Sequence, residues 1–340
     1  MRRKTILTLF AVLVLSWLSG AASLRAFTIG GAVRQPLNLS LEDLSRMESV
    51  FVRLDEVTGD KQFRGVFTYR GVPLRTLLDL ATVQKETPGF SKAIDLAVVV
   101  RNREGLTAVM SWGELFYRNP SEVIVAVSGT PIRPHSTNCG ACHGMQVAQG
   151  ALEQLNRKAA FPKLVVANDF FTDRSIEDVV NIEVVDLKGT AEKKSMKKLF
   201  AQKLTLVIDG KTTEITDLSG YKRIDVLAKE VGDGRGYHGL KNLSGVSLRE
   251  LLSKASTRME TDSVILASAP DGYRSLFSYG EVILAPQGER IVVADRLNGR
   301  PIEENGKFLL VPPDDLAADR TVKAVERIEV VNKLEQRMAK

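Results

Sequence analysis

The segment GVPLRTLL at residues 71–78 recurs as GVSLRELL at residues 245–252. In both copies a Gly-Val turn precedes leucines at helical spacing, and this pattern predicts a loop that leads into a short amphipathic helix. Other matches follow these two segments in the same order along the chain. The ordered matches indicate an internal duplication, in which each half of the chain builds the same scaffold.

The matched segments also predict strands in each half. An apolar run that begins at Ile94 corresponds to one that begins at Ser263, and such runs are typical of buried strands. Near the end of each half, Arg174 and Arg320 are expected to anchor a turn through the adjacent Asp173 and Asp319. Further strands are expected at 123–127, 163–166 and 181–184 in the first half, and at 291–294, 308–311 and 327–330 in the second.

The two halves differ above all in one connection. Leu164 follows Pro131 by 33 positions, whereas Leu310 follows Pro301 by only 9, so the first half carries an insertion of 24 residues. An insertion that leaves the flanking strands intact is expected to project from the surface. This insertion contains both cysteines of the chain and two of its three histidines.

The repeated scaffold resembles the molybdopterin-binding domain of the sulfite oxidase superfamily. In the first half the resemblance rests on FTIGGAV at 27–33, PLNLSLEDL at 36–44, the 71–78 segment, the Gly-x-Pro-Ile turn and the closing Ile-Glu-Val. In the second it rests on DGY at 271–273, NGRPI at 298–302 and LLVP at 309–312. It implies an α+β chain, mainly β, with two tandem mixed α/β domains and short helices between strands.

The resemblance also implies where a catalytic metal would bind, and here the chain departs from the family. Members that catalyse oxygen-atom transfer bind molybdenum through a cysteine thiolate, a soft ligand suited to that metal. Cys139 and Cys142 are the only cysteines of this chain, and neither belongs to the repeated scaffold. We therefore expect both copies to be degenerate, without a molybdenum–pterin cofactor, because a fold does not carry its function with it.

The insertion contains Cys139-Gly-Ala-Cys142-His143, which is the attachment signature of c-type haem. Thiols three positions apart share one face of a helical turn, where both can form thioethers with a porphyrin. His143 then supplies the proximal ligand of the iron. A zinc site that includes His135, a plain disulfide and a thioredoxin-like Cys-x-x-Cys are the competing interpretations. The histidine after the second cysteine favours one covalent haem c.

The distal haem ligand stays open at the level of sequence. His135 lies four residues before Cys139, and His238 lies in a glycine-rich segment of the second half. A ligand from that segment would clamp the two halves together. An open five-coordinate iron is a further alternative. The remaining candidates are the methionines Met47, Met110, Met145, Met196, Met259 and Met338.

The first 22 residues are predicted to be a cleaved signal peptide. Three basic residues precede an apolar run of about 13 residues, which is shorter than the roughly 20 needed to span a membrane, and small residues follow the run. An uncleaved anchor is the alternative, and we expect membrane association only in that case. The expected divisions are 1–22 (signal peptide), 26–187 (first domain, with the haem insertion at about 133–160), 188–202 (basic linker) and 203–332 (second domain).

The net charge and the predicted export limit the classes of function that we expect. Removal of Arg2, Arg3 and Lys4 lowers the formal charge from +6 to +3, which gives no case for nucleic-acid binding. We expect a periplasmic c-type cytochrome that transfers single electrons to another redox protein, for which an acidic partner would suit the basic linker. A molybdopterin-dependent oxidoreductase with the haem as internal electron acceptor, and a haem-based sensor, are the alternatives.

Overall fold

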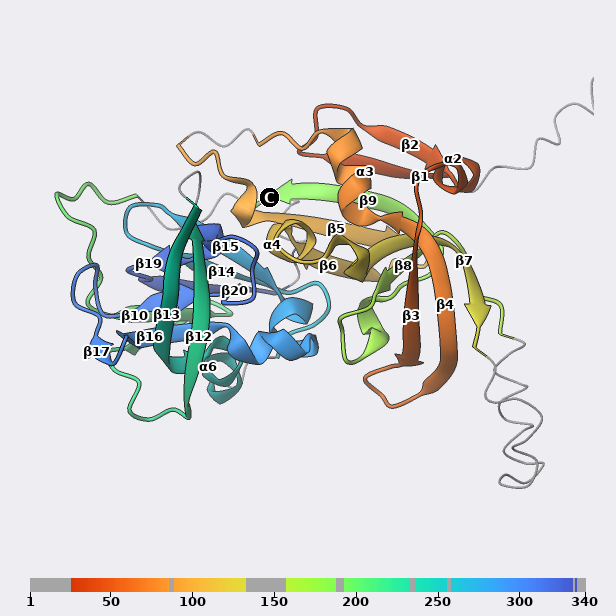
Figure 1. The fold of residues 1–340 in the computed structure, drawn as a ribbon. Coiled ribbons are helices and arrows are strands. Elements are labelled where there is room, and N and C mark those ends of the chain that lie inside the picture. Colours follow the sequence, from red (N-terminus) through yellow and green to blue (C-terminus); the bar gives the residue numbers. More distant parts are fainter. Residues whose placement is uncertain are drawn as a thin grey trace, which may run out of the picture.

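The structure, a computed structural model, describes residues 26–85, 89–132, 157–187, 193–232, 236–255, 258–332 and 334. The strands from β1 (Ala26–Gly31) to β9 (Val179–Asp186) form one half of the molecule. Those from β10 (Leu204–Ile208) to β20 (Arg327–Val331) form the other half. The two halves lie side by side, the first in red to light green and the second in green to blue (Figure 1).

The first half contains two sheets. Its five-stranded sheet has the order β2-β1-β9-β5-β6, in which β1 and β9 are parallel and the other neighbours antiparallel. Its four-stranded sheet has the order β3-β4-β7-β8 and is wholly antiparallel. The bounds are β2 Leu37–Ser40, β3 Val50–Val57, β4 Phe63–Pro73, β5 Leu96–Asn102, β6 Thr107–Ser111, β7 Val123–Pro131 and β8 Lys163–Val166.

The second half repeats both sheets. The order β11-β10-β20-β14-β15 matches the first five-stranded sheet, including one parallel pair, β10 with β20. The order β12-β13-β16-β18 matches the four-stranded sheet, and this sheet has two further strands, β19 beside β18 and β17 beside β16. The bounds are β11 Lys211–Ile215, β12 Arg223–Gly232, β13 Gly236–Ser247, β14 Val264–Ser268, β15 Arg274–Ser278, β16 Val292–Leu297, β17 Arg300–Pro301, β18 Leu309–Val311 and β19 Val322–Lys323.

The helices are short, and each packs one face on a sheet. The two leucine-rich repeats form α3 (Leu74–Ala81) and α6 (Leu248–Lys254), as their leucine spacing predicts. In α3 the buried residues are Leu74, Leu77, Leu78 and Ala81, which share one stripe of the helix. Two helices of at most six residues, α2 (Leu41–Arg46) and α4 (Trp112–Phe116), begin with a serine capping box.

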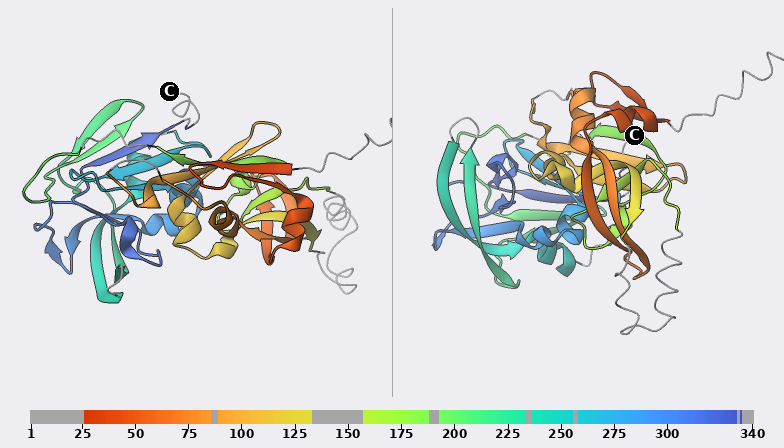
Figure 2. Two further views of the ribbon diagram at one scale, coloured as in Figure 1. Left: turned by 90° about the horizontal axis from the view of Figure 1, so that it is seen from above. Right: turned by 45° about the vertical axis from the view of Figure 1, so that its right-hand side comes forward.

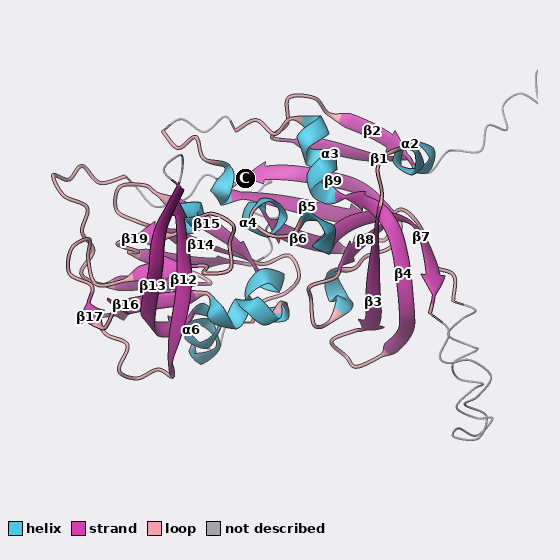
Figure 3. Ribbon diagram, in the orientation of Figure 1, coloured by secondary structure: helices cyan, strands magenta, loops and turns pink. Residues whose placement is uncertain are grey.

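The predicted α+β class with mixed α/β domains is wrong. Strands make up 46% of the structure and helices 18%, and the architecture consists of several sheets with two half-barrels. Figure 3 shows that the helices are short elements between the strands, several of them grouped beside α6. The leucine spacing predicts that helices form, but α3 and α6 have only 8 and 7 residues and build no layer of their own. The protein is therefore mainly β.

Each half has its own core, and a third apolar cluster joins the halves. This joining cluster combines Ala97, Val99 and Val109 of the first half with Val264, Leu266 and Leu276 of the second. The backbone N–H of Val109 donates to Thr261 O at 3.0 Å across the same boundary. The two five-stranded sheets thus meet along β6 and β15, as the two views in Figure 2 also show. Among the described residues, no helix is long and apolar enough to span a bilayer.

Candidate functional site

The predicted haem-binding insertion leaves the first half between two paired strands. β7 and β8 pair antiparallel with Ala126 opposite Lys163, and β16 and β18 pair in the same way with Ala294 opposite Leu309. The second half joins its two strands by a short segment, whereas the first joins them through residues 132–162. The predicted ligands Cys139, Cys142, His143 and His135 lie outside the described residues.

Both described ends of this connection are held against β4. On the outgoing side, the backbone N–H of Ile132 donates to Val66 O at 2.8 Å. On the returning side, the Phe161 ring packs edge-on against Tyr69, with the ring centroids 6.5 Å apart. Nearby, the backbone N–H of Ala160 donates to Glu177 Oε2 at 2.8 Å. The scaffold therefore fixes the two points between which the insertion must extend.

Five polar side chains, Glu56, Tyr69, Arg157, Lys163 and Glu177, form a base cluster beneath these ends. Lys163 is only 1% exposed and Glu56 only 2% exposed. The Lys163 ammonium pairs with Glu56 and donates to Tyr69 Oη at 3.2 Å and to Glu177 Oε1 at 3.1 Å. Arg157, the first described residue of the returning part of the connection, pairs with both glutamates.

The charges of the base cluster are balanced, two cations against two carboxylates. Burial alone would raise the pKa of Glu56, but the charges of Lys163 and Arg157 outweigh burial and hold this pKa below its ordinary value. Burial and the Glu56 carboxylate raise the pKa of Tyr69, so its hydroxyl keeps the proton and donates to Glu56 Oε1 at 2.5 Å. Because every group in the cluster is paired, its role is to hold the strands and the returning end of the connection together.

The second half lacks this cluster. The strand registers place Leu243 at the position of Tyr69 and Leu309 at the position of Lys163. Glu230 alone is retained, at the position of Glu56. The sequence match of 163–166 with 308–311 is thus one residue out of register, because the paired strands align Lys163 with Leu309 and not with Phe308. This replacement of polar by apolar residues is the sequence signal that could have revealed the base cluster.

His238, the other predicted distal ligand, is exposed on β13. It lines a recess together with Lys92 of the first half and Tyr273 of the second, so its hairpin does face the first half. However, β12 and β13 lie on the opposite side of the molecule from β7 and β8 in all views (Figures 1 and 2). The structure therefore does not bring His238 beside the strands that carry the insertion. Met110 is fully buried in the core of the first half.

A second set of buried charges, here called the central cluster, lies where the halves meet. Arg174 donates to both oxygens of Asp169 at 2.7 Å and contacts Glu114 at 3.0 and 3.1 Å. Arg320 donates to both oxygens of Asp315 at 2.7 Å, and it contacts Glu281 at 3.0 and 2.5 Å. The predicted anchors Asp173 and Asp319 are wrong, because each arginine pairs with the aspartate five residues before it and not with its neighbour.

The central cluster links the halves reciprocally. Ser278 of the second half donates to Glu114 at 2.9 Å, and Ser111 of the first donates to Glu281 at 2.6 Å. Each arginine also lies over a glycine of the other half. A Cβ atom at Gly113 would lie 2.0 Å from Arg320 Cζ, and one at Gly280 would lie 1.9 Å from Arg174 Cζ. Glycine avoids this clash with a buried guanidinium at both positions, and the two glycines lie in similar segments, WGE at 112–114 and YGE at 279–281.

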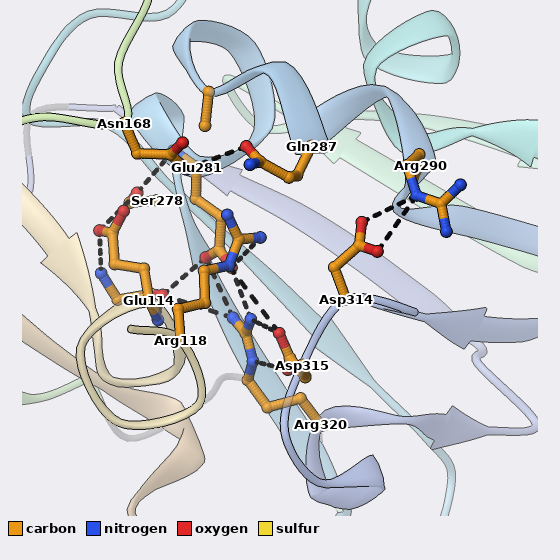
Figure 4. Close-up of polar contacts among 12 residues, drawn as sticks. Glu114, Arg118, Asn168, Ser278, Glu281, Gln287, Arg290, Asp314, Asp315 and Arg320 are labelled. Carbon is orange, nitrogen blue, oxygen red and sulfur yellow. Dashed lines mark hydrogen bonds and ion pairs between the residues drawn. The ribbon is translucent and has the colours of Figure 1, made fainter. Parts of the chain in front are cut away.

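Arg118 makes the surroundings of the two glutamates in the central cluster different. Its Nη2 atom lies 3.3 Å from Glu281 Oε1, so Glu281 faces two guanidinium groups (Figure 4). Burial would raise the pKa of Glu281, but Arg320 and Arg118 outweigh burial and lower it to about 2. Glu114 has Arg174 as its one cationic partner, and burial raises its pKa. All of these groups are buried and paired, which suits a structural link between the halves.

The described residues contain no group of three or more His, Cys, Asp or Glu side chains that could hold a metal. No protein-family model and no curated protein matches the chain. Among solved structures, the chain is similar to the sulfane dehydrogenase SoxCD from Paracoccus pantotrophus, at 14% identity and a TM-score of 0.33. The match covers 88% of this chain and 77% of that one. A likeness this distant supports no conclusion about activity.

Proposed function

We propose that the protein is an exported c-type cytochrome that transfers single electrons through one haem, attached to Cys139 and Cys142 with His143 as the proximal ligand. The observation that carries the proposal is the Cys-x-x-Cys-His sequence, which places two thiols and an imidazole on one turn. A covalent haem supplies an iron that cycles between two oxidation states, and its ligands and burial set the potential.

The described scaffold supports this proposal through the position of the insertion. The motif lies in the connection between β7 and β8, where the second half has only a short segment and no cysteine. The base cluster is likewise confined to the half that carries the motif. We infer that the paired charges of Lys163 and Arg157 fix the returning end of the connection, and that the Ile132–Val66 hydrogen bond fixes the outgoing end. A redox group on a surface segment requires such fixed ends for a defined approach to its partner.

We propose His135, and not His238, as the distal ligand of the iron. His135 belongs to the same insertion as the proximal ligand, whereas the hairpin with His238 lies on the other side of the molecule. A His135→Ala variant should then change the absorption bands of the haem, and the matched His238→Ala variant should leave them unchanged. Loss of a spectral feature in His238→Ala alone would contradict this assignment.

The haem itself is tested by absorption spectroscopy of the exported protein after acid–acetone extraction, which removes haem that is not covalently bound. The wild-type protein should keep its haem, and Cys142→Ser should lose at least one of the two thioether links, visible as a shifted α-band of the pyridine haemochrome. A normal two-thioether spectrum in Cys142→Ser would overturn the proposal. Secretion of the mature protein without residues 1–22 tests the proposed export.

Two alternative functions make different predictions for the same sample. If the scaffold served as a molybdopterin-dependent oxidoreductase, molybdenum would be present in equal amount to iron. We propose that it is absent, because neither cysteine lies in the repeated scaffold that resembles the sulfite oxidase superfamily. Rapid binding of carbon monoxide to the reduced iron would favour a haem-based sensor. The proposed partner is a second periplasmic redox protein, and such encounters are weak and salt-dependent.

A further inference from the structure

A recess of about 470 Å³ opens on the second half, between the β12–β13 hairpin and β18. Its volume lies within the range of about 300–1,000 Å³ that is typical of small-molecule sites. We call it the aliphatic recess, because its floor consists of aliphatic side chains from four strands and the segment between them. These side chains are Ala228, Leu243, Leu297, Ile302, Leu309 and Val311.

The aliphatic recess occupies the place that the base cluster fills in the first half. Leu243 replaces Tyr69, and Leu309 replaces Lys163. Lys323 takes the position of Glu177, since it lies opposite Leu309 on the neighbouring strand. The strands pair as they do in the first half, but the phenol and the ammonium that fill the space there are absent. What remains is apolar surface that a hydrocarbon body could cover.

A second, more polar recess of about 330 Å³ adjoins the first. It is lined by Lys92, Asp271, Tyr273, His238 and Asp319, among others. The two recesses meet at four residues that line both of them, namely Glu230, Ala318, Thr321 and Lys323. A ligand with an apolar body and a polar end can therefore extend from one recess into the other.

The charges at this junction favour an anionic end. The acidic groups are already engaged, Asp319 with Lys92 at 2.7 Å and Glu230 with Lys241 at 3.2 Å. Asp271 accepts from the backbone N–H of Tyr273 at 2.9 Å. Within the described part of the chain, neither Lys323 nor His238 has a hydrogen-bond or ion-pair partner. Two donor groups are thus left for a ligand, and an anion is the strongest acceptor for them.

The rim of the aliphatic recess carries charges of both signs, because Arg300 and Lys229 line it together with Glu303 and Glu304. Glu303 and Glu304 are exposed and line the aliphatic recess, but they do not line the second recess. A carboxylate at the junction would face Lys323 and His238.

We propose that the two recesses bind a medium-chain aliphatic carboxylate, with the alkyl chain on Leu243 and Leu309 and the carboxylate at Lys323 and His238. At about 30 Å³ for each water-sized group, the aliphatic recess holds on the order of 15 non-hydrogen atoms, close to the size of dodecanoate. This site is independent of the proposed haem, because its proposed contact residues Leu243, Leu309, Lys323 and His238 all belong to the half without the insertion.

The test is isothermal titration of the full mature holoprotein with sodium dodecanoate below its micelle concentration. We expect one ligand per chain. Dodecanol should bind at least about tenfold more weakly, since it lacks the charge that Lys323 and His238 meet. Absence of saturable dodecanoate binding, or equal affinity for dodecanol, would overturn the proposal.

Variants locate the site. Leu243→Tyr with Leu309→Lys introduces the two side chains that fill the equivalent place in the first half and should abolish binding. Lys323→Gln should weaken binding about tenfold. Lys222→Gln removes an exposed lysine outside both recesses and serves as the matched control. Thermal unfolding and the haem spectrum verify that each variant is folded. Undiminished binding by the folded double variant would place the ligand elsewhere and refute the assignment, whatever the outcome for the haem.

Discussion

The base cluster of the first half and the aliphatic recess of the second half occupy equivalent places on the same strand framework. In the first half, Tyr69 and Lys163 project from paired strands and meet the buried Glu56. In the second half, Leu243 and Leu309 stand at those two positions, and Glu230 pairs instead with Lys241 at 3.2 Å. Two replacements thus turn a filled, charged interior into an open apolar recess.

The difference shows how strongly one buried charge constrains its neighbours. Glu56 is 2% exposed and needs its cations, because an unpaired carboxylate in that position would lose its hydration without compensation. Glu230 is only half-buried, so it can pair at the rim and release the interior positions to leucine. The half with the proposed haem insertion therefore contains the buried base cluster. The other half contains the aliphatic recess at the equivalent place.

The largest effect is expected at the central cluster, where the two halves are nearly but not fully equivalent. Glu281→Gln removes the charge that Arg320 and Arg118 share and should lower the free energy of unfolding at neutral pH by about 3 kcal/mol. Glu114→Gln removes a carboxylate with one guanidinium partner and should cost less. Urea unfolding of both variants and the wild type measures the comparison. An equal loss in both variants would contradict the inequality assigned to Arg118.

The two glutamates should also respond to pH in opposite directions. The folded-state pKa of Glu281 is lowered from 4.5 to about 2, so its contribution to stability is complete above about pH 4.5 and is lost as the pH falls towards 2. The deficit of Glu281→Gln relative to wild type should shrink over that window. The pKa of Glu114 is raised, so ionisation costs native stability as the pH rises above 4.5. Glu114→Gln should therefore be relatively more stable at pH 7 than at pH 4.

A smaller effect is expected from a matched pair in the two equivalent interiors. Lys163→Met leaves Glu56 with Arg157 and Tyr69 but without its buried ammonium, and should cost about 2–3 kcal/mol of unfolding free energy. Leu309→Met, at the same place in the second half, conserves volume and polarity and should cost less than about 1.5 kcal/mol. Thermal or urea unfolding measures both. Similar losses would mean that the base cluster contributes little beyond apolar packing.

The smallest effect is expected from the Tyr69 hydroxyl. Tyr69→Phe removes the hydrogen bond that the hydroxyl donates to Glu56 and the one that it accepts from Lys163, but it keeps the ring that Phe161 contacts. The loss should be about 1–2 kcal/mol. Leu243→Phe adds a ring to the open recess of the second half and should change stability by less. A larger effect at Leu243 would show that the recess is tightly packed and unable to accept a ligand.

Much of the strand and helix arrangement could be predicted from the sequence because it depends on local periodicity. The leucine repeats predicted α3 and α6, and the apolar runs predicted β5, β7, β8, β9, β14, β16, β18 and β20; these predictions are confirmed to within a few residues at the ends. The class was predicted wrongly, since periodicity reports that a helix forms but not how little of the architecture it builds. The partner of Arg174 was also predicted wrongly. This arginine pairs with Asp169, five residues earlier, and not with the adjacent Asp173.

By itself, the sequence determined the duplication, the place of the insertion and the set of soft ligands within it, because repeats and ligand spacing are properties of the linear chain. Only the tertiary structure decided that Lys163 faces Glu56 and that Leu309 stands in its place, since a shift of one residue in strand register moves a side chain to the other face. Likewise, Arg320 packs against Gly113 and Arg174 packs against Gly280 only when the two halves are in contact. Such contacts join residues more than a hundred positions apart, and no local pattern encodes them.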